Sequence, residues 1–306
     1  MRRVWFIWFS ALLIPYCITI VWAGQIQGEV KEHTISSGKT VILERKEGNR
    51  ILDIEEYLIG MLALQIPPEY GIEALKAQAI VDRTYLYQIL DGRTEIKEEE
   101  LDTDYMEWSQ MIEEWGQLMA AEHYQTFQKA VSSTAATIMK YEGEYVRPLF
   151  HKISAGKTRT GDQNLFPYLL GTDSKRDVEA EEYLHIIVLS ENEFDKKIAD
   201  ILSDKENCSG VFDTVQIIKR DDAGYIEQMQ IAGNTYTGEE VQYTLGLPSS
   251  CFFLTREEEG KIRIVVKGVG HGYGMSQYGA KVMAEDGWKA EDILKYYYQN
   301  IVLIFE

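Results

Sequence analysis

The sequence predicts an α+β fold: a single mixed ectodomain with a smaller inserted subdomain, preceded by an N-terminal transmembrane helix. Three observations predict it. An uncharged, mainly apolar run, Val4–Gly28, follows two arginines. Apolar residues recur at helical spacing between Ile54 and Leu90. Short strand-like stretches bounded by glycine, such as those within Thr40–Leu52, occur in the same ectodomain as the helices, and no clean linker or repeat divides it.

Composition limits the classes of function. The chain has 306 residues, of which 45% are hydrophobic, enough to bury one large core or two modest ones. Its formal net charge is −18, which repels nucleic acid phosphates and anionic lipid headgroups. We therefore expect no nucleic acid partner.

Residues 1–28 are predicted to be a membrane anchor or a signal segment. About twenty helical residues span the roughly 30 Å of a bilayer core, and Arg2 and Arg3 before the run place the rest of the chain outside the cytoplasm. Val21-Trp22-Ala23 resembles a cleavage site, so a cleaved signal peptide is the alternative. The length of the run and the bulk of Trp22 favour the anchor. In both cases residues 29–306 are exported.

The first elements after this segment are two strands and a helix. Strands are expected at Thr40–Leu43 and Arg50–Leu52, with glycines in the turns. From Ile54 the pattern becomes helical, with one apolar face that continues until Pro67-Pro68 ends the helix.

Two further helices are expected before residue 130. One runs from about Ile72 to Leu90, with Gly92 as its C-terminal signal. The other covers Leu101–Ala121, and its aromatic residues, including Trp108 and Trp115, are predicted to face the core rather than a ligand.

The second half of the chain mixes strands and helices. A subdomain is expected between about Glu179 and Leu254, within an otherwise continuous ectodomain. Strands are predicted at Ile138–Tyr141, Val146–His151 and Ile262–Lys267, a hairpin at Val211–Ile218 and Tyr225–Ile231, and helices at Met275–Glu285 and Ala290–Gln299.

The three cysteines give little support for a metal site. Cys17 lies in the apolar run without a convincing lipidation motif. Cys208 and Cys251 could form a disulfide in an oxidising compartment, a question that the sequence leaves open. Neither belongs to a CxxC pair, so we expect no zinc site and no cofactor.

A glycine-rich loop, Gly268–Ala280, is the strongest local motif, with the sequence GVGHGYGMSQYGA. A strand leads into it and a helix leads out. This places His271, Ser276 and Gln277 near a helix N-terminus, where free N–H groups can bind oxygen atoms. The glycine spacing matches neither a dinucleotide-binding fingerprint nor a P-loop. A tight turn that packs a strand on a helix is the purely structural alternative.

The second motif spans the end of one helix and most of the next. Leu64–Tyr70 reads LQIPPEY, and Glu73–Tyr85 contains EALKAQA followed by RTY. At helical spacing, Gln78 and Asp82 share a face. Taken alone, this segment predicts an ordinary amphipathic helix.

Together the two motifs resemble the stage II sporulation protein D, or amidase-enhancer, family. Its members carry the ALKAQA…RTY helix and a closing GHGxGMSQYGA loop. Between them, Phe150–Thr158, FHKISAGKT, is similar to the family's HSxSGGxT stretch. Gly233–Ser250 resembles the segment before the loop, and Ile293–Tyr298 the terminal helix. The resemblance covers about residues 30–301, and the N-terminal membrane anchor of the family agrees with the anchor expected at residues 1–28. It implies that residues 29–306 form a domain that binds or cleaves peptidoglycan.

The resemblance also implies a site. Gln65, Glu69 and Arg83 would occupy the catalytic part of a cleft. Residues expected to contact the glycan are Lys76, Gln78, Tyr85, His151, Ser154, Lys157, Thr158, His271, Ser276, Gln277 and Tyr278. Some relatives are thought to bind zinc near the segment equivalent to His151, but no cysteine lies near it here, so the metal is not expected.

Sporulation members of the family are lytic transglycosylases, in which one glutamate protonates the glycosidic oxygen and then assists attack by the sugar's own 6-hydroxyl. The resemblance places that glutamate at Gln65, and alanine is usual at Asp82. Glutamine cannot deliver a proton. The first hypothesis is therefore a peptidoglycan-binding homologue, weakly active or inactive, that supports an amidase or another wall-remodelling membrane protein. The alternative is an active lytic transglycosylase using Glu69 or another carboxylate. A purely structural surface protein ranks last.

Overall fold

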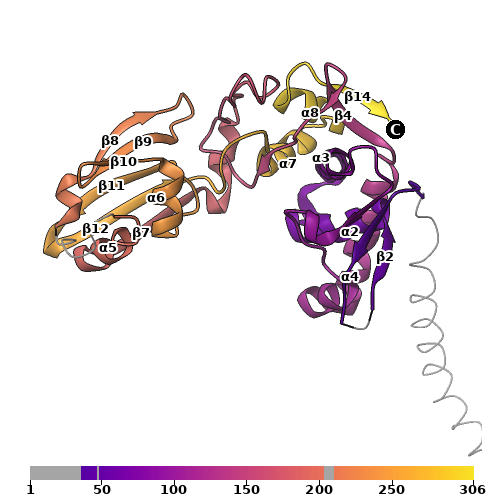
Figure 1. Ribbon diagram of the computed structural model, residues 1–306, viewed down its shortest axis with the longest axis horizontal. Coiled ribbons are helices and arrows are strands. Elements are labelled where there is room, and N and C mark those ends of the chain that lie inside the picture. Colours follow the sequence, from indigo (N-terminus) through magenta and orange to yellow (C-terminus); the bar gives the residue numbers. More distant parts are fainter. Residues whose placement is uncertain (1–35, 47, 203–209) are drawn as a thin grey trace, which may run out of the picture. The chain divides into compact units, whose positions relative to one another are not determined.

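The computed structural model describes residues 36–46, 48–202 and 210–306, and Ser37–Glu306 form one compact unit (Figure 1). Helices and several small sheets give this part of the chain a mixed α+β fold, which confirms the predicted class. In the ranges described, no helix is long and apolar enough to cross a bilayer. The expected anchor at residues 1–28 lies outside these ranges, as does Cys208.

The first hydrophobic core lies between three helices and a small sheet. Asp53 caps the first of these helices by accepting a hydrogen bond from Glu55 N, and Pro67 follows the helix's end. The sheet has the order β2-β1-β3. The elements are β1 (Thr40–Leu43), β2 (Arg50–Asp53), α2 (Ile54–Gln65), α3 (Ile72–Leu90), β3 (Glu95–Lys97) and α4 (Trp108–Ser132). The predicted strands and the first two helices are confirmed.

Helix α3 is buried on nearly all sides, unlike the amphipathic helix that the sequence predicted. Leu75 and Leu86 pack in the first core, whereas Ala77 and Val81 pack in a second core with α7 (Gln277–Glu285) and α8 (Ala290–Tyr297). Its polar side chains are therefore enclosed and must find partners within the protein. This requirement shapes the functional site described below.

Helix α4 departs from its predicted position. It begins at Trp108, not Leu101, and continues to Ser132, beyond the predicted end at Ala121. Gly116 interrupts it with φ 75° and ψ 154°, a conformation that glycine adopts most easily. The spacing of the aromatic residues predicted a helix in this part of the chain. It did not predict the break, because the sequence on both sides of Gly116 favours a helix.

The second core also contains two sheets built from distant segments. One has the order β14-β4-β5, and the other joins β6 and β13 in parallel. The predicted strand Val146–His151 is wrong over Val146–Leu149, where Pro148 lacks an N–H for a ladder. The strands are β4 (Thr137–Tyr141), β5 (Glu144–Tyr145), β6 (Phe150–His151), β13 (Met275–Ser276) and β14 (Val302–Phe305).

Among the described residues, the buried side chains of a third core lie between Phe194 and Val266. The inserted subdomain was expected between about Glu179 and Leu254, so this core extends beyond its expected end. One sheet has the order β11-β12-β7 and the other β10-β9-β8, and α5 and α6 pack with them (Figure 1). The predicted hairpin is shorter than expected, because Val211–Thr214 form a 3₁₀ turn. The elements are β7 (Leu184–Ser190), α5 (Glu191–Ile198), β8 (Gln216–Arg220), β9 (Ile226–Ile231), β10 (Asn234–Tyr236), α6 (Gly238–Leu245), β11 (Phe252–Glu257) and β12 (Lys261–Lys267).

Arg159 connects this third segment to the glycine-rich loop. Its buried guanidinium pairs with Asp221 and Glu239 and lies between the rings of Tyr225 and Tyr273, 5.0 and 4.4 Å from their centroids. Two carboxylates and two aromatic faces compensate for removing the cation from water.

Candidate functional site

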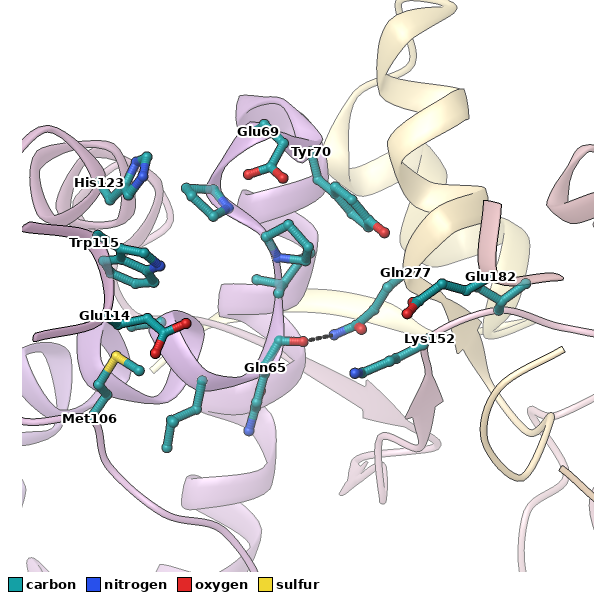
Figure 2. Close-up of a pocket in the computed structure, with 16 residues that line it drawn as sticks. Gln65, Glu69, Tyr70, Met106, Glu114, Trp115, His123, Lys152, Glu182 and Gln277 are labelled. Carbon is teal, nitrogen blue, oxygen red and sulfur yellow. Dashed lines mark hydrogen bonds between the residues drawn. The ribbon is translucent and has the colours of Figure 1, made fainter. Parts of the chain in front are cut away.

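A cleft of about 540 Å³ opens at the C-terminal end of α2 (Figure 2). One wall is the end of α2 and the 3₁₀ turn Pro68–Tyr70, and the opposite walls come from α4, from the segment after β6 and from the start of α7. The cleft therefore combines parts of the chain that are far apart in sequence. Its lining residues are Ala63, Leu64, Gln65, Ile66, Pro67, Pro68, Glu69, Tyr70, Met106, Glu114, Trp115, His123, Lys152, Ile153, Glu182 and Gln277.

Two local features of the chain open this cleft. Ile66 leaves the helical conformation with φ −138°, as expected for a residue before Pro67, so α2 stops with Gln65 at its end. On the other side, the break at Gly116 lets the Trp115 ring meet His123 edge-on at 5.0 Å between centroids. An aromatic ring at a cleft wall offers a surface on which a sugar ring can stack.

Gln65 is half-buried and joins a network of amides behind the cleft. One end of its side-chain amide lies 2.9 Å from each carboxylate oxygen of Asp82, and the other end lies 3.1 Å from Thr103 Oγ1. Gln78 Nε2 donates to Asp82 Oδ1 at 3.0 Å. Gln277 Nε2 donates to Gln78 Oε1 at 3.1 Å and to the Gln65 carbonyl at 3.0 Å, the bond drawn in Figure 2. Residues from α2, α3 and α7 are thus fixed against one another.

Asp82 is the carboxylic acid of this network. Its side chain is buried, and burial raises its pKa to about 8, although the bond from Gln78 and the charge of Arg83 act in the opposite direction. The sequence marked Asp82 only as an unusual residue on α3. Its position directly behind Gln65 is a result of the structure.

Three other carboxylates line the cleft itself: Glu69, Glu114 and Glu182. All three are exposed. Among the described residues no hydrogen bond links Glu69 to Arg83 or His271.

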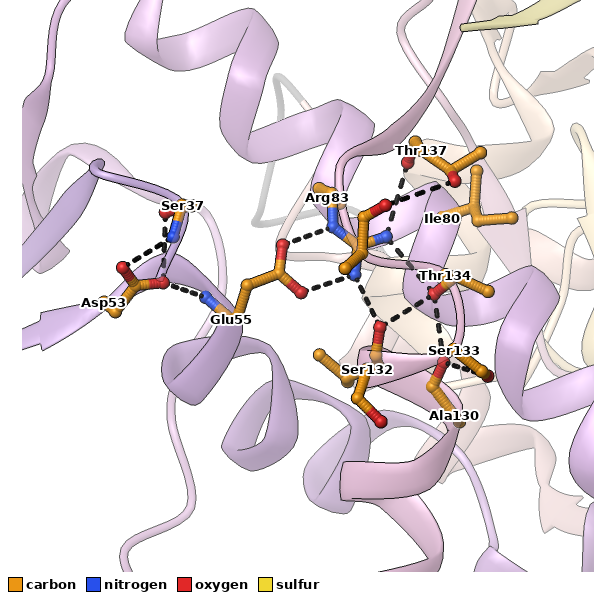
Figure 3. Close-up of polar contacts among 12 residues, drawn as sticks. Ser37, Asp53, Glu55, Ile80, Arg83, Ala130, Ser132, Ser133, Thr134 and Thr137 are labelled. Carbon is orange, nitrogen blue, oxygen red and sulfur yellow. Dashed lines mark hydrogen bonds and ion pairs between the residues drawn. The ribbon is translucent and has the colours of Figure 1, made fainter. Parts of the chain in front are cut away.

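Arg83 does not line the cleft, and its predicted place in the catalytic centre is wrong. The side chain is fully buried in α3 and forms two 2.7 Å bonds with the carboxylate of Glu55 (Figure 3). Its other donors reach Thr134 Oγ1 and the carbonyls of Val131 and Thr137. With these donors engaged, Arg83 ties α2 and α3 to the end of α4.

Tight backbone contacts explain the glycines of the Gly268–Ala280 loop. A Cβ at Gly274, where φ is +70°, would lie 1.8 Å from the Leu149 carbonyl oxygen. A Cβ at Gly279 would lie 2.0 Å from the Tyr297 hydroxyl oxygen. The loop is therefore pressed against β6 and α8, which supports the structural interpretation of its glycines.

His151 and His271 face each other across this loop, with ring centroids 5.8 Å apart. Burial, with a smaller contribution from the neighbouring His271, lowers the pKa of His151 to about 3. His151 Nδ1 lies 3.0 Å from the Tyr273 carbonyl oxygen, while its Nε2 contacts no hydrogen-bond partner in the described ranges. His271 Nδ1 accepts from Tyr273 N, and burial lowers the pKa of His271 too. Neither ring lines the cleft.

The two predicted serines serve the structure of the loop. Asp177, which the sequence did not single out, accepts from Ser154 N and Ser276 Oγ at 2.7 Å each and from Ser174 Oγ at 2.9 Å. Ser276 Oγ also caps α7 by accepting from Gly279 N. Burial raises the pKa of Asp177 despite these bonds. The set is a buried cross-link rather than a binding surface.

The remaining predicted contacts also lie outside the cleft lining. Thr158 is paired with Thr172 through backbone and hydroxyl, and Lys157 lies beside it in an isolated bridge with Asp173. Lys76 forms a salt bridge with Glu73 at 3.0 Å, and the Tyr85 hydroxyl accepts from Asp102 N. Tyr278 meets Tyr70 edge-on, next to the cleft.

Of the residues predicted for the site, the structure brings Gln65, Glu69 and Gln277 into the cleft, with Gln78 directly behind them. Sequence reasoning missed the lining residues Met106, Glu114, Trp115, His123 and Glu182. Trp115 was assigned to the core. It does pack there, yet it also reaches the cleft because Gly116 ends that stretch of helix.

Comparisons with known proteins match this chain to stage II sporulation proteins and to an amidase enhancer. A family model described as Stage II sporulation protein matches residues 45–141. The chain is 33% identical over 261 residues to Stage II sporulation protein D of Bacillus amyloliquefaciens, covering 82% of this chain and 74% of the relative. It is 29% identical over 264 residues to the protein of the same name in Bacillus subtilis (strain 168), covering 81% and 74%. An amidase enhancer of that strain is 25% identical over 299 residues, covering 80% of this chain and 40% of the relative.

Proposed function

Since the chain belongs to the stage II sporulation protein D family, we propose that it binds peptidoglycan glycan strands in this cleft, in sporulation or related cell-wall remodelling, and cleaves them weakly or not at all. The relatives named for sporulation and for amidase enhancement support the wall-related role. One observation carries the statement about cleavage: Gln65 occupies the cleft wall at the position where the family resemblance places the catalytic glutamate.

The chemistry of this substitution is direct. A glutamate can protonate the glycosidic oxygen and later withdraw a proton from the 6-hydroxyl, whereas an amide can do neither. Losing general acid–base assistance slows such a reaction by about 10²–10⁴-fold. An amide can still hydrogen-bond the sugar, so binding survives the change that removes cleavage.

The cleft lining offers several groups that suit a glycan. Trp115 offers a ring for stacking, and Gln65 and Gln277 offer amides for hydroxyl and acetamido groups. Figure 2 shows Lys152 on the side of the cleft opposite α4, near Gln65 and Gln277. Its ammonium group is suited to the carboxylates of the lactyl groups and peptide stems of peptidoglycan.

An active lytic transglycosylase is the second candidate, because Glu69, Glu114 and Glu182 all line the cleft. All three are exposed. The test must therefore measure products as well as binding.

The full chain, purified in mild detergent, would be incubated with purified glycan strands, and anhydro-muropeptides would be quantified by mass spectrometry. Binding to intact sacculi would be measured in parallel. Binding without products supports the proposal. Efficient product formation by the native chain, without the loss of about 10²–10⁴-fold that a missing general acid causes, overturns it, and Glu69→Gln, Glu114→Gln and Glu182→Gln then identify the acid.

Lys152→Ala tests whether binding uses this cleft. We expect a several-fold loss of affinity for sacculi, in line with the roughly 1 kcal/mol of one charge-assisted contact. Lys175→Ala is the matched control, because Lys175 is exposed and lies outside the cleft. Equal losses in both variants would show that the contribution of Lys152 is only general charge.

We also propose that residues 1–28 tether the domain outside the cytoplasmic membrane, where a cell-wall amidase or another wall-remodelling membrane protein is its partner. The apolar run behind two arginines and the amidase-enhancer relative support this. Membrane fractionation with protease accessibility tests the tether, since digestion from outside must remove the domain.

A further inference from the structure

Asp82 is a buried carboxyl group with an unusual set of partners. It is 1% exposed, and no salt bridge involves it in the part of the chain that the structure describes. Its hydrogen-bond partners are the side-chain amides of Gln65 and Gln78. Burying an ionised carboxylate without a paired cation costs free energy, so burial favours the protonated form of Asp82.

The position of the Gln65 amide links Asp82 to the cleft. Gln65 lines the cleft, one end of its amide lies 2.9 Å from both Asp82 oxygens, and the other end lies 3.1 Å from Thr103 Oγ1. The oxygen and the nitrogen of an amide have almost the same shape, so hydrogen bonding decides which of them faces Asp82.

The two protonation states of Asp82 demand opposite orientations. A neutral Asp82 donates its O–H to the Gln65 oxygen, which leaves the Gln65 NH₂ group on the cleft side. An ionised Asp82 can only accept, so the NH₂ group turns inward between its two oxygens and the Gln65 oxygen faces the cleft. Gln78 Nε2 donates to Asp82 Oδ1 at 3.0 Å and to Gln65 Oε1 at 3.3 Å, and turning the amide exchanges the second of these bonds for the two contacts with Asp82.

We propose that Asp82 is a positioning residue that, by gaining or losing one proton, reverses the Gln65 amide and switches this part of the cleft wall from a hydrogen-bond donor to an acceptor. The proposal rests on the proposed function for the nature of the ligand, though not for the switch itself. Glycosidic and acetamido oxygens only accept hydrogen bonds, so the neutral form of Asp82 is the one that favours glycan binding.

The groups around Asp82 either are engaged with other partners or carry no charge, so Asp82 is the group of this network that gains or loses the proton. Arg83, next to it on α3, is directed to Glu55, and its charge acts on Asp82 only at longer range. From the end of α8, the buried Tyr298 hydroxyl faces Asp82 and donates to the Leu149 carbonyl. Gln65 from α2 and Gln277 from α7 supply amides without charge.

The switch is tested first without a ligand. The full chain would carry glutamine labelled with ¹³C at the side-chain carbonyl, and the Gln65 signal, identified by its loss in Gln65→Ala, would be followed by NMR from pH 6 to 9.5. We expect a one-proton transition with a midpoint near pH 8, the value to which burial raises the pKa of Asp82. Asp82→Asn, whose amide mimics the neutral acid, removes the transition. A Gln65 signal that does not titrate in the native chain overturns the proposal.

Glycan binding tests the consequence. With N-acetylglucosamine oligomers as the probe, we expect affinity to fall about tenfold between pH 6.5 and 9.5, the effect of losing one hydrogen bond and opposing two acceptors. The dependence must disappear in Asp82→Asn, which stays in the tight form, and in Gln65→Ala, in which Asp82 still titrates but has no amide to turn. Persistent pH dependence in Gln65→Ala contradicts the switch. A titrating Gln65 signal without glycan binding at any pH supports the switch and overturns the proposed ligand.

Discussion

The chemistry of the side chain at position 65 depends on the side chain at position 82. The two side chains are in hydrogen-bond contact, so the amide of Gln65 is the group that lets a carboxyl group occupy position 82. Restoring glutamate at position 65 alone would set two carboxyl groups at hydrogen-bond distance, and such a pair titrates as one unit that shares a proton.

We predict that Gln65→Glu alone yields little glycan cleavage, whereas Gln65→Glu combined with Asp82→Ala yields at least tenfold more. The double variant frees the new acid from its competitor for the proton, and general acid–base assistance is worth about 10²–10⁴-fold. Anhydro-muropeptides measured by mass spectrometry at several pH values check this. Asp82→Ala alone is the control and must form no products. Equal activity of the single and double variants would contradict the coupling.

A second prediction concerns Arg83. Because its guanidinium and the Glu55 carboxylate are both buried, Arg83→Met leaves an unpaired buried charge and lowers the free energy of unfolding by about 3–5 kcal/mol. Chemical denaturation measures this. Adding Glu55→Met to Arg83→Met removes the stranded charge and recovers most of the loss. If Arg83 instead contacted the glycan, both variants would lose binding at 25 °C while still folded.

The sequence motifs predicted some of the residues that line the cleft, but they did not predict where buried polar side chains find their partners. Gln65, Glu69 and Gln277 were placed in the cleft from motifs alone, and the structure has them there. Arg83 could not be placed, because its partner Glu55 is 28 residues away and nothing in the local pattern marks a buried pair. Asp177 was missed for the same reason, since its partners Ser154 and Ser276 are 23 and 99 residues away.

Among the elements, α2 and α3 were predictable and α4 was not. The first two have continuous apolar patterns and end at Pro67-Pro68 and at Gly92, so local signals define them. In α4 the break at Gly116 depends on φ and ψ values that a helical pattern does not reveal. The α4 residues on either side of this break, Trp115 and His123, line one wall of the cleft. Because the break was not predicted, these two residues were not predicted to belong to the site.

Gly116→Ala tests the role of this break. Alanine at φ 75° and ψ 154° costs about 1–3 kcal/mol, which favours straightening α4 and moving Trp115 away from His123. We predict that affinity for glycan strands falls about tenfold or more while the protein stays folded. Gly143→Ala is the matched control, because Gly143 has φ +92° with open space around it and lies outside the cleft. It should lose similar stability without losing affinity. Binding that survives Gly116→Ala unchanged would show that the break is not needed.

Across the whole molecule, buried groups with opposite pKa shifts set how stability depends on pH. The raised pKa of Asp82 means that its contribution is fully present below pH 4 and is lost as pH rises to about 8. The lowered pKa of His151 means that its contribution is present above pH 6.5 and is lost as pH falls to about 3. Between pH 4 and 6.5 the two effects oppose each other, and above pH 6.5 only the loss from Asp82 remains.

We therefore predict that the native chain becomes less stable between pH 6.5 and 8, and that Asp82→Asn abolishes this decline. The free energy of unfolding from urea denaturation at fixed pH values checks it, with an expected difference on the order of 1–2 kcal/mol. His151→Gln serves as the comparison: it should flatten the acid side of the profile and leave the decline above pH 6.5 intact. A decline of equal size in Asp82→Asn would assign it to another group.

The contact between positions 65 and 82 also determines the order in which substitutions at these two positions can be tolerated. In a chain that still carried the glutamate and alanine usual for its family, changing the alanine to aspartate first would have created two competing acids. Changing the glutamate to glutamine first opens the way for the aspartate to follow. Once both changes are present, reverting glutamine to glutamate alone brings the conflict back. The pair therefore makes a catalytic glutamate at position 65 hard to gain by a single substitution, because the change at position 65 depends on a change at position 82.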